Sequence, residues 1–399
     1  MIERELIAAC LAKPDLLHEI DLEPKHFGSE VCQTIWGKML ELSKAGEPFD
    51  AVTVSGALGR LGAEVIGMVN ERVGSASNAQ AYAKRIRQAW LDTESKRIMA
   101  SGEPLDEIIT ELMNLTTNDT AQSITIQEAM KQAVDDMQAA SECKGIRGIT
   151  TGLERLDSHL GGWHNGDLAV VGARPAMGKT ALLLHFAAKC GVSLGLISTE
   201  QPAYQIAQRH CASIGKVSLR DLRSGKVGDA EMKAVIAVNR TLRDYYIYDQ
   251  SSPTILDIMR QARKWKHRHG IRILFVDYIQ RINGAGDRRH EQVGDVVRGL
   301  KTLARDLNIP VVALAQVSRA VESRQDRRPN MGDLSDSSEI EKEADQVLTL
   351  YRDEVYDENT ADKGIAEIDI CKNRHGHTGF VKVAWHGSTV SFGDLSWYD

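Results

Sequence analysis

The sequence predicts an α/β fold with a mostly parallel sheet covered by helices on both faces, preceded by a small all-α domain. Two observations support this prediction. From Gly148 onward, short apolar runs alternate with intervals long enough for a helix, which is typical of a parallel sheet. In the N-terminal quarter, apolar side chains instead recur at helical spacing, for example at Val31, Ile35 and Met39.

The sequence divides into three expected parts. The helical part, 1–100, shows no catalytic constellation and is expected to serve packing or oligomerisation. The linker, 101–147, is polar and contains one amphipathic helix at about 126–137. The apolar face of that helix needs a partner, either in this chain or on a neighbouring subunit, and the sequence leaves both open. The α/β domain spans 148–399. The residues that share the apolar face of the linker helix are Ile126, Met130, Val134 and Met137.

Eight apolar runs are expected to form strands. The earlier runs are separated by helix-sized intervals, whereas the last two lie close together and predict an antiparallel pair at the edge of the sheet. The expected strands are 168–173, 194–199, 245–248, 273–277, 310–315, 346–351, 366–371 and 380–385.

The composition indicates a soluble, globular protein of two or three domains, with 399 residues, 42% hydrophobic and 26% charged. No run resembles the ~20 apolar residues of a membrane span, and the acidic start does not resemble a signal peptide. The six cysteines are scattered without a C-x-x-C pair, which favours reduced thiols in the cytoplasm over disulfides or a zinc site. A net charge of −6 neither indicates nor excludes a nucleic-acid partner, because such binding depends on local basic surfaces.

The most informative motif is a Gly-Lys-Thr loop between an apolar run and a helix without breakers. Backbone N–H groups of such a loop converge on phosphate oxygens at the positive end of the helix. Lys179 is expected to reach the β and γ phosphates, and the hydroxyl of Thr180 to bind Mg²⁺. The pattern G-x-x-x-x-G-K-[ST] is met except at its first position, where Ala173 stands one residue after Gly172. The residues expected to bind ATP or another nucleoside triphosphate are Gly172, Ala173, Arg174, Pro175, Ala176, Met177, Gly178, Lys179, Thr180 and Ala181.

Three polar residues follow apolar runs whose carboxyl ends should meet near that loop. Asp277 is expected to hold Mg²⁺, with capping of the next turn as the alternative. Glu200 is a candidate to orient and deprotonate the attacking water, or an acid that starts a helix. Gln316 either senses the γ phosphate or satisfies a buried backbone group, and spacing alone does not separate these roles.

Two basic segments should leave the same edge of the sheet. The segment 281–290 follows the strand that ends at Asp277, and the segment 318–328 follows Gln316. Both are candidates to contact a polyanion, although solvated charged loops have the same composition. The arginines of the second segment are Arg319, Arg324, Arg327 and Arg328.

A charged pair, Lys372 and Arg374, lies at the tip of an expected strand near the C-terminus. Such a charged pair is often only part of the solvated surface and has no further role. In an oligomeric ATPase it could instead be an arginine finger that reaches a neighbour's γ phosphate. The sequence spacing does not choose between the two.

Several motifs together resemble those of the replicative DNA helicases of the DnaB type, which are hexameric motors with a RecA-like P-loop NTPase core. The resemblance covers nearly the whole chain, and the alanine at the start of the phosphate loop is itself a feature of this family. The motifs are Gly148-Ile-Thr-Thr-Gly-Leu-Glu-Arg-Leu-Asp157, Gly172-Ala-Arg-Pro-Ala-Met-Gly-Lys-Thr180, Ser198-Thr-Glu-Gln-Pro202, Val276-Asp-Tyr-Ile-Gln280, Pro310-Val-Val-Ala-Leu-Ala-Gln316 and Tyr351-Arg-Asp-Glu-Val-Tyr356.

The resemblance implies a role for each matching residue. Lys179 and Thr180 would bind nucleotide and metal, Glu200 would activate water, and Asp277 would hold Mg²⁺. Gln316 would sense the γ phosphate. The resemblance further implies that Arg374, with Lys372 beside it, acts on the nucleotide of the adjacent subunit.

The resemblance also implies an assembly. It predicts a hexameric ring that encircles single-stranded DNA, travels along it 5′ to 3′ and unwinds the duplex at a replication fork. The helix at about 126–137 resembles the family's linker helix, which packs on the next protomer, and 1–100 resembles the collar domain, which pairs with its neighbours and serves primase. A helicase loader is a further implied partner.

One segment departs from the family pattern. In the central DNA loop of the family, Asp-Leu is typically followed by Arg-Glu-Ser-Gly, whereas Asp333-Leu334 is followed here by Ser335-Asp-Ser-Ser338. Backbone amides together with Ser335, Ser337 and Ser338 are the remaining candidates for DNA contacts in this loop. The part before the linker is also shorter than usual, which suggests a phage-encoded variant.

Two other functions fit part of the same pattern. A RecA-like recombinase would coat DNA as a filament, but it would need a second DNA site and an open helical assembly, whereas a linker helix and a collar favour a closed ring. An ATP-switched ring scaffold that never translocates would hydrolyse ATP without responding to DNA.

Overall fold

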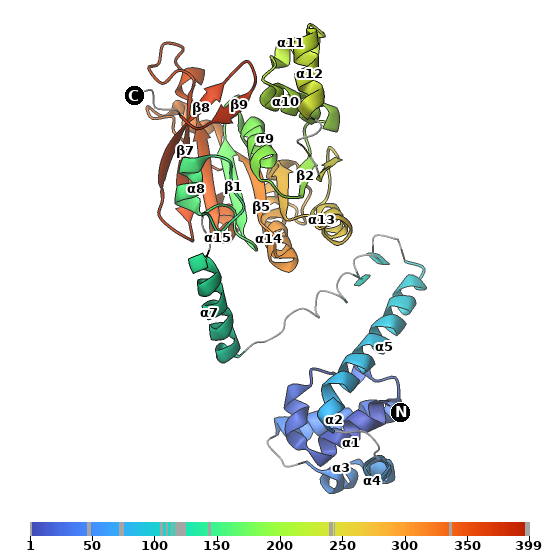
Figure 1. Ribbon diagram of the computed structural model, residues 1–399. Coiled ribbons are helices and arrows are strands. Elements are labelled where there is room, and N and C mark those ends of the chain that lie inside the picture. The colour runs from blue at the N-terminus through green and yellow to red at the C-terminus, as the bar shows by residue number, and fades with distance from the viewer. Residues whose placement is uncertain are drawn as a thin grey trace. The chain divides into compact units, whose positions relative to one another are not determined.

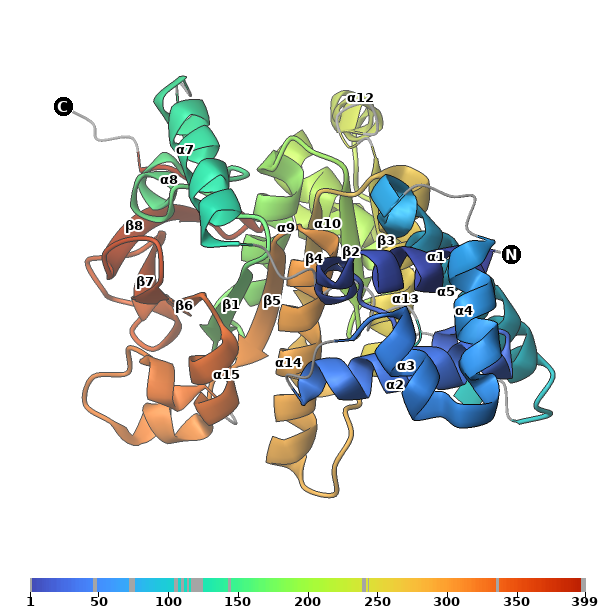
Figure 2. The same ribbon diagram turned by 90° about the horizontal axis from the view of Figure 1, so that it is seen from below.

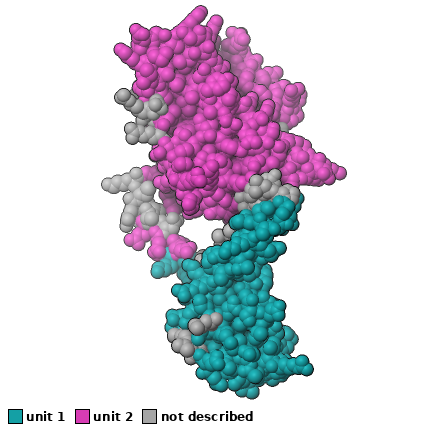
Figure 3. All heavy atoms as spheres, turned by 90° about the vertical axis from the view of Figure 1, so that its right-hand side faces the viewer, with its two compact units in different colours: residues 1–131 teal, residues 132–399 magenta. Residues whose placement is uncertain are grey.

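The chain forms two compact units, 1–131 and 132–399 (Figure 3). The computed structural model describes residues 2–45, 49–71, 76–103, 107–108, 111–112, 115, 125–142, 145–238, 242, 244–334 and 337–395.

The first unit is helical, as the apolar spacing predicts (Figure 1). Ile35 and Met39 lie at predicted apolar positions and are fully buried in its core, together with Leu6. Trp36 lies in the same core and donates its indole N–H to the carbonyl of Leu22 at 2.8 Å, so its one polar atom is satisfied. The helices of this unit before residue 100 are α1 (Ile2–Ala12), α2 (Glu30–Lys44), α3 (Ala51–Leu58), α4 (Gly62–Asn70) and α5 (Ala79–Met99).

One stretch of the first unit, Ala51–Asn70, has the length and apolar composition of a membrane-spanning helix, which we did not expect from the sequence. In the structure this stretch is not one straight helix. Gly59 has φ +55° and ends α3, and a short 3-10 turn, Gly59–Leu61, precedes α4. Val54 of α3 and Val65 of α4 are both buried in the core of the unit. The stretch is therefore a bent pair of short helices that bury one side in the core and expose the other, and each is too short to cross a bilayer.

The second unit is built on one sheet. In its described part, the strands are hydrogen-bonded in the order β3-β2-β4-β5-β1-β6-β7-β8-β9. The first six in this order are parallel to one another, and the last three continue the sheet through antiparallel pairings. The strands are β1 (Leu168–Ala173), β2 (Leu194–Ser198), β3 (Tyr245–Asp249), β4 (Ile273–Asp277), β5 (Val311–Gln316), β6 (Gln346–Tyr351), β7 (Ile365–Asn373), β8 (Gly379–His386) and β9 (Ser391–Gly393).

Helices cover both faces of this sheet (Figure 2). Alternate residues of β1 divide between the faces. Ala169 and Val171 share a core with α9, whereas Leu168 and Val170 share the opposite core with α14. The first face carries α8 (Glu154–Leu160), α9 (Lys179–Lys189) and α10 (Ala203–Gly215), and the second carries α13 (Ile255–His269), α14 (Arg289–Leu307) and α15 (Ser337–Glu343). Two further helices, α11 (Leu219–Ser224) and α12 (Asp229–Val238), follow α10.

The predicted fold class is confirmed, and all eight expected strands are present with ends that differ by at most two residues. One prediction about the sheet is wrong. The strands at 365–373 and 379–386 are antiparallel, but the edge beside them is a further strand, Ser391–Gly393. This strand was missed because three residues ending in glycine are too short to show an alternating pattern.

The predicted amphipathic helix is α7, which is longer than expected and spans Ile126–Glu142. Its apolar face is exposed. Ile126, Met130, Val134 and Met137 expose 66%, 63%, 59% and 70% of their surface. Four large apolar side chains on one face of a helix form a surface of the kind that packs against another part of the chain or against another subunit.

Candidate nucleotide-binding site

The parallel strands place the predicted polar residues at one edge of the sheet. Ala173, the last residue of β1, lies opposite Gln316 at the end of β5. Ser198, the last residue of β2, lies opposite Asp277 at the end of β4. The phosphate loop, Asp277 and Gln316 therefore share the carboxyl edge of the sheet, where ligands bind in folds of this kind.

A cavity of about 390 Å³ lies over the phosphate loop. The loop turns through two residues with left-handed backbone, Ala176 (φ +68°) and Gly178 (φ +95°), and α9 begins directly afterwards at Lys179. This geometry aims backbone N–H groups at the cavity from the N-terminus of a helix. All of the expected nucleotide-binding residues line the cavity except Gly172 and Met177.

Gly172 has a packing role instead. It lies in the middle of the sheet, and a Cβ atom at this position would come within 2.1 Å of Leu334. The glycine that stands one residue early in the motif is thus explained by the close approach of the chain that follows β5. Met177 is buried beneath the loop in the core shared with α9.

Lys179 lies inside the cavity with its ammonium group over an aromatic ring. The Nζ atom is 4.3 Å from the ring centroid of Tyr278 and 3.5 Å from the carbonyl oxygen of Ala315. Burial lowers the pKa of this lysine, and the carboxylates of Asp277 and Glu200 act in the opposite direction. A buried ammonium group that lies inside the cavity is suited to a highly charged phosphate ligand.

Thr180 and Asp277, the two residues predicted to bind Mg²⁺, contact each other. The Thr180 hydroxyl donates to Oδ2 of Asp277 at 2.9 Å. Burial raises the pKa of Asp277, and its second oxygen, Oδ1, is buried without a hydrogen-bond partner. An unsatisfied buried carboxylate oxygen beside a hydroxyl fits the ligand set of Mg²⁺, a hard cation that binds oxygen atoms.

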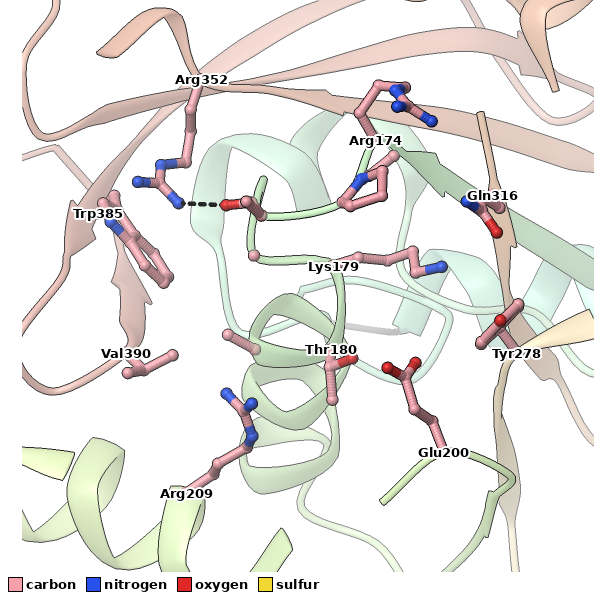
Figure 4. A pocket seen from close by; sticks show the side chains of 15 residues that line it. Arg174, Lys179, Thr180, Glu200, Arg209, Tyr278, Gln316, Arg352, Trp385 and Val390 are labelled. Atoms are coloured by element: carbon pink, nitrogen blue, oxygen red, sulfur yellow. Dashed lines mark hydrogen bonds between the residues drawn. The ribbon is translucent and has the colours of Figure 1, made fainter. Parts of the chain in front are cut away.

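Glu200 and Gln316 flank the Lys179 side chain (Figure 4). Glu200 comes two residues after β2 ends and lines the cavity with its carboxylate. The backbone N–H of Gln316 donates to the Oε1 atom of Gln280 at 3.1 Å, and the Gln316 side chain lines the cavity. Both side chains therefore line the same cavity as the phosphate loop.

Five residues of the cavity were missed by sequence reasoning: Arg209, Tyr278, Arg352, Trp385 and Val390. Arg352 donates to the carbonyl of Ala176 at 3.2 Å and stacks over the Trp385 ring at 4.2 Å (Figure 4). Tyr278 directly follows β4 and Arg352 directly follows β6, so the rule that found Asp277 could have found both. Trp385 comes from the antiparallel strand β8 and Val390 from the turn between β8 and β9, and neither carries such a signal.

Lys372 and Arg374 lie at the opposite edge of the sheet from the phosphate loop. Because β7 is antiparallel to β6, its last residue, Asn373, pairs with Gln346, the first residue of β6. Arg374 therefore cannot reach the nucleotide site of its own chain. It makes an ion pair with Asp345 at 3.0 Å, and Lys372 donates to the carbonyl of Glu341 at 2.6 Å.

Comparison with known proteins identifies the family. Residues 148–394 match the model of the DnaB-like helicase C terminal domain, and residues 1–88 match the model of the DnaB-like helicase N terminal domain. The chain belongs to the DnaB-like helicase family. It is 33% identical to the replicative DNA helicase DnaC of Bacillus subtilis, over 96% of this chain and 91% of that one. It is 32% identical to the replicative DNA helicase DnaB of Geobacillus stearothermophilus, over 91% and 87%.

Solved structures agree with this assignment. A DnaB-like replicative helicase, described with its interactions with primase, superposes with a TM-score of 0.75 at 25% identity, covering 99% of both chains. A second solved structure, an ATPase domain, superposes with a TM-score of 0.66 at 29% identity, covering 69% of this chain and all of that domain. The DnaB-like fold therefore extends over both units.

The arginines predicted to contact DNA in this DnaB-like chain are largely engaged within it. Arg324 pairs with Asp333, and Arg328 pairs with Glu367 at 2.6 Å. Arg327 stacks over the Tyr356 ring at 4.8 Å. Arg319 is exposed at the start of the 3-10 turn Arg319–Ser323. Of the four, Arg319 is the one best placed to meet an external phosphate.

The serines of the departing segment are only partly described. Ser335 and the side chain of Ser337 lie outside the described residues. Ser338 is exposed in the first turn of α15. The DNA contacts expected from this segment therefore stay a prediction.

Proposed function

We propose that this chain is one subunit of a hexameric ring that hydrolyses ATP to travel along single-stranded DNA and to unwind the duplex at a replication fork. The observation that supports this most is the division of the site residues between two edges of one sheet. Lys179, Asp277 and Glu200 lie at one edge and Arg374 at the other. Such a subunit completes its site only against a neighbour placed head to tail, an arrangement that forms a ring when the rotation between subunits closes and a filament when it does not. The linker helix and the collar favour the closed ring. Membership of the DnaB-like helicase family supports DNA as the substrate.

In this proposal the phosphate loop, with Lys179, binds the triphosphate, and Thr180 and Asp277 hold Mg²⁺. The bound metal would neutralise charge on the phosphate oxygens. Glu200 takes the proton of the attacking water, and Gln316 contacts the γ phosphate. Arg374, with Lys372 beside it, enters from the adjacent subunit and stabilises the charge that develops during transfer.

We further propose that Trp385 and Arg352 hold the base of the nucleotide. Replacing Trp385 with alanine is expected to raise the KM for ATP about 10-fold with a smaller effect on kcat, because aromatic stacking on a base contributes about 1–3 kcal/mol. Steady-state hydrolysis over a range of ATP concentrations measures this. The matched control is Phe380→Ala, since Phe380 lies on the same strand, exposes 64% of its surface and is outside the cavity. An unchanged KM in Trp385→Ala would exclude the stacking role.

Ring closure is assigned to the exposed face of α7, which we propose packs on the next protomer. Met130→Glu is expected to weaken ring assembly about 10-fold or more, because a charge is placed in an apolar contact. Light scattering coupled to size exclusion over a concentration series measures the oligomer. Gln132→Glu adds the same charge on the opposite side of the helix and should leave the ring intact. Equal assembly of both variants contradicts the proposal.

Single-stranded DNA is proposed to pass through the ring along the segments that follow β4 and β5, with Arg319 as the best exposed contact. Residues 1–100 are proposed to act as the collar that serves primase, and residues 101–147 as the linker. A helicase loader is a further proposed partner. The proposed partners, which are DNA, primase and a helicase loader, are found in the cytoplasm, and we propose the same location for this protein.

The test of the proposed function is the response of ATP hydrolysis to DNA. A motor is expected to hydrolyse ATP faster when single-stranded DNA is added. A ring scaffold that never translocates would show the same rate with and without DNA. A recombinase would form open filaments on the DNA, which electron microscopy distinguishes from rings.

A further inference from the structure

A single buried carboxylate lies behind Arg374. Asp345, the residue before β6, exposes only 3% of its side chain. Its Oδ2 atom accepts from the backbone N–H of Leu168 at 2.8 Å and from Nζ of Lys301 at 2.6 Å. Its Oδ1 atom accepts from an Nη of Arg374 at 3.0 Å. One oxygen is thus fixed on the protein core, and the other is fixed on the guanidinium.

The groups that hold the Asp345 carboxylate on the core side belong to β1 and α14. Leu168 is the first residue of β1, the strand that ends at the phosphate loop. Lys301 extends from α14 and also donates to the carbonyl of Gly166 at 2.8 Å. The backbone of Asp345 donates to the carbonyl of Leu168 at 2.9 Å and accepts from the N–H of Arg374 at 3.0 Å. The main chain and the side chain of Arg374 are therefore both tied to Asp345.

The neighbours of Arg374 in the chain are anchored as well. The amide of Asn373 donates to the carbonyl of His159 at 3.2 Å. The ring of His375 lies 2.5 Å from the carboxylate of Asp167, which precedes β1. A turn that is held on both sides of Arg374 presents that residue in one place at the edge of the sheet.

The guanidinium of Arg374 is nevertheless available. The side chain is 52% exposed, and the contact with Asp345 uses one of its two Nη atoms. The remaining N–H groups can form the paired hydrogen bonds that arginine makes with phosphate. The pair with Asp345 therefore orients Arg374 without consuming it.

We propose that Asp345, fixed by Lys301 and Leu168, is the positioning residue of the trans-acting arginine. This inference rests on the proposed function, in which Arg374 serves the adjacent subunit's nucleotide. Asp345 does not touch that nucleotide. It restricts the guanidinium of Arg374 to the orientation in which it can enter the nucleotide site of the adjacent subunit. A misplacement of about 1 Å in such a group lowers the rate on the order of 10²-fold.

The first variant is Asp345→Asn in the full-length protein. The amide has the shape of the carboxylate, but it has one acceptor oxygen for donors on both sides. The expected result is a fall in kcat on the order of 10²-fold, with the KM for ATP and the binding of a fluorescent ATP analogue unchanged. Turnover equal to or above that of the unaltered protein would overturn the proposal. An increase would mean that Asp345 sequesters Arg374.

A matched control removes another carboxylate from an ion pair in the same unit. Asp306 lies on α14 and pairs with Arg263 at 3.2 Å, far along the helix from the nucleotide site. Asp306→Asn is expected to leave kcat and KM unchanged. A fall in kcat in this variant equal to that of Asp345→Asn would attribute both effects to general destabilisation and overturn the proposal.

Mixing subunits separates positioning of the finger from damage to the subunit's own site. Asp345→Asn subunits have an intact phosphate loop, and Lys179→Ala subunits have an intact finger. In mixed rings some interfaces combine the two, so hydrolysis should recover above that of either variant alone. A reference mixture of Arg374→Ala with Lys179→Ala should recover in the same way. Recovery in the reference mixture alone overturns the role of Asp345 and leaves the proposed function standing. Recovery in neither overturns the trans role of Arg374 itself, and the inference with it.

Circular dichroism and a melting curve establish that Asp345→Asn is folded. If this variant does not fold, Lys301→Gln takes its place, because it keeps the pair between Asp345 and Arg374 but releases the carboxylate from α14. It is expected to show a smaller loss of kcat that mixing with Lys179→Ala restores. Full turnover, or a loss that mixing does not restore, would overturn the proposal.

Discussion

Arg374→Ala is expected to lower ATP turnover by about 10³-fold or more, which is the contribution typical of an arginine that stabilises a transferring phosphoryl group. Nucleotide binding should be unchanged, because Arg374 and the phosphate loop lie at opposite edges of the sheet in one chain. The measurement is single-turnover hydrolysis at saturating ATP, together with titration of a fluorescent ATP analogue.

The control for Arg374 is an arginine with no place in the site. Arg268 is exposed in the last turn of α13, and Arg268→Ala should leave hydrolysis unchanged. A lowered affinity for nucleotide in Arg374→Ala would point to a role within the chain. Turnover equal to that of the unaltered protein would contradict the trans assignment.

Glu200→Gln is expected to lower hydrolysis by about 10²–10⁴-fold, the range typical for loss of a general base. The amide keeps the size of the side chain but cannot take a proton from water. ATP should still bind, since Lys179, Thr180 and Asp277 are unaltered, and the ring should remain loaded with unhydrolysed nucleotide. Quenched-flow hydrolysis and analysis of the bound nucleotide measure both quantities.

Glu358→Gln is the matched control for Glu200, because Glu358 is exposed and outside the cavity. Normal hydrolysis is expected in the control. If Glu200→Gln also hydrolyses ATP normally, Glu200 is an acid at the start of a helix and another group must activate the water.

Much of the fold and part of the site follow from local sequence. Buried parallel strands are short apolar runs, so their positions can be read directly, and a polar residue after such a run falls at the carboxyl edge of the sheet. This reasoning places Asp277 and Gln316 correctly beside the phosphate loop. It also explains why Arg352, which follows β6, belongs to the cavity.

Other parts of the site depend on contacts between distant residues and have no local signal. Trp385 lies on a strand that the sequence predicts, but its contact with the phosphate loop at Gly178 joins segments about 200 residues apart and leaves no local pattern. The link from Arg374 to Asp345 joins residues 29 positions apart through the register of β6 and β7. The in-chain pairing of Arg324 and Arg328 likewise appears only in three dimensions, since their partners come from separate segments.

The central claim is that this protein is a motor that unwinds DNA, and forked duplexes test it most directly. The purified protein, with ATP and Mg²⁺, is given forks that carry only a 5′ tail or only a 3′ tail, and displacement of the labelled strand is measured. We predict displacement that requires the 5′ tail and is lost in Glu200→Gln. Intact ATP hydrolysis without displacement of any fork would contradict the claim and favour a ring scaffold.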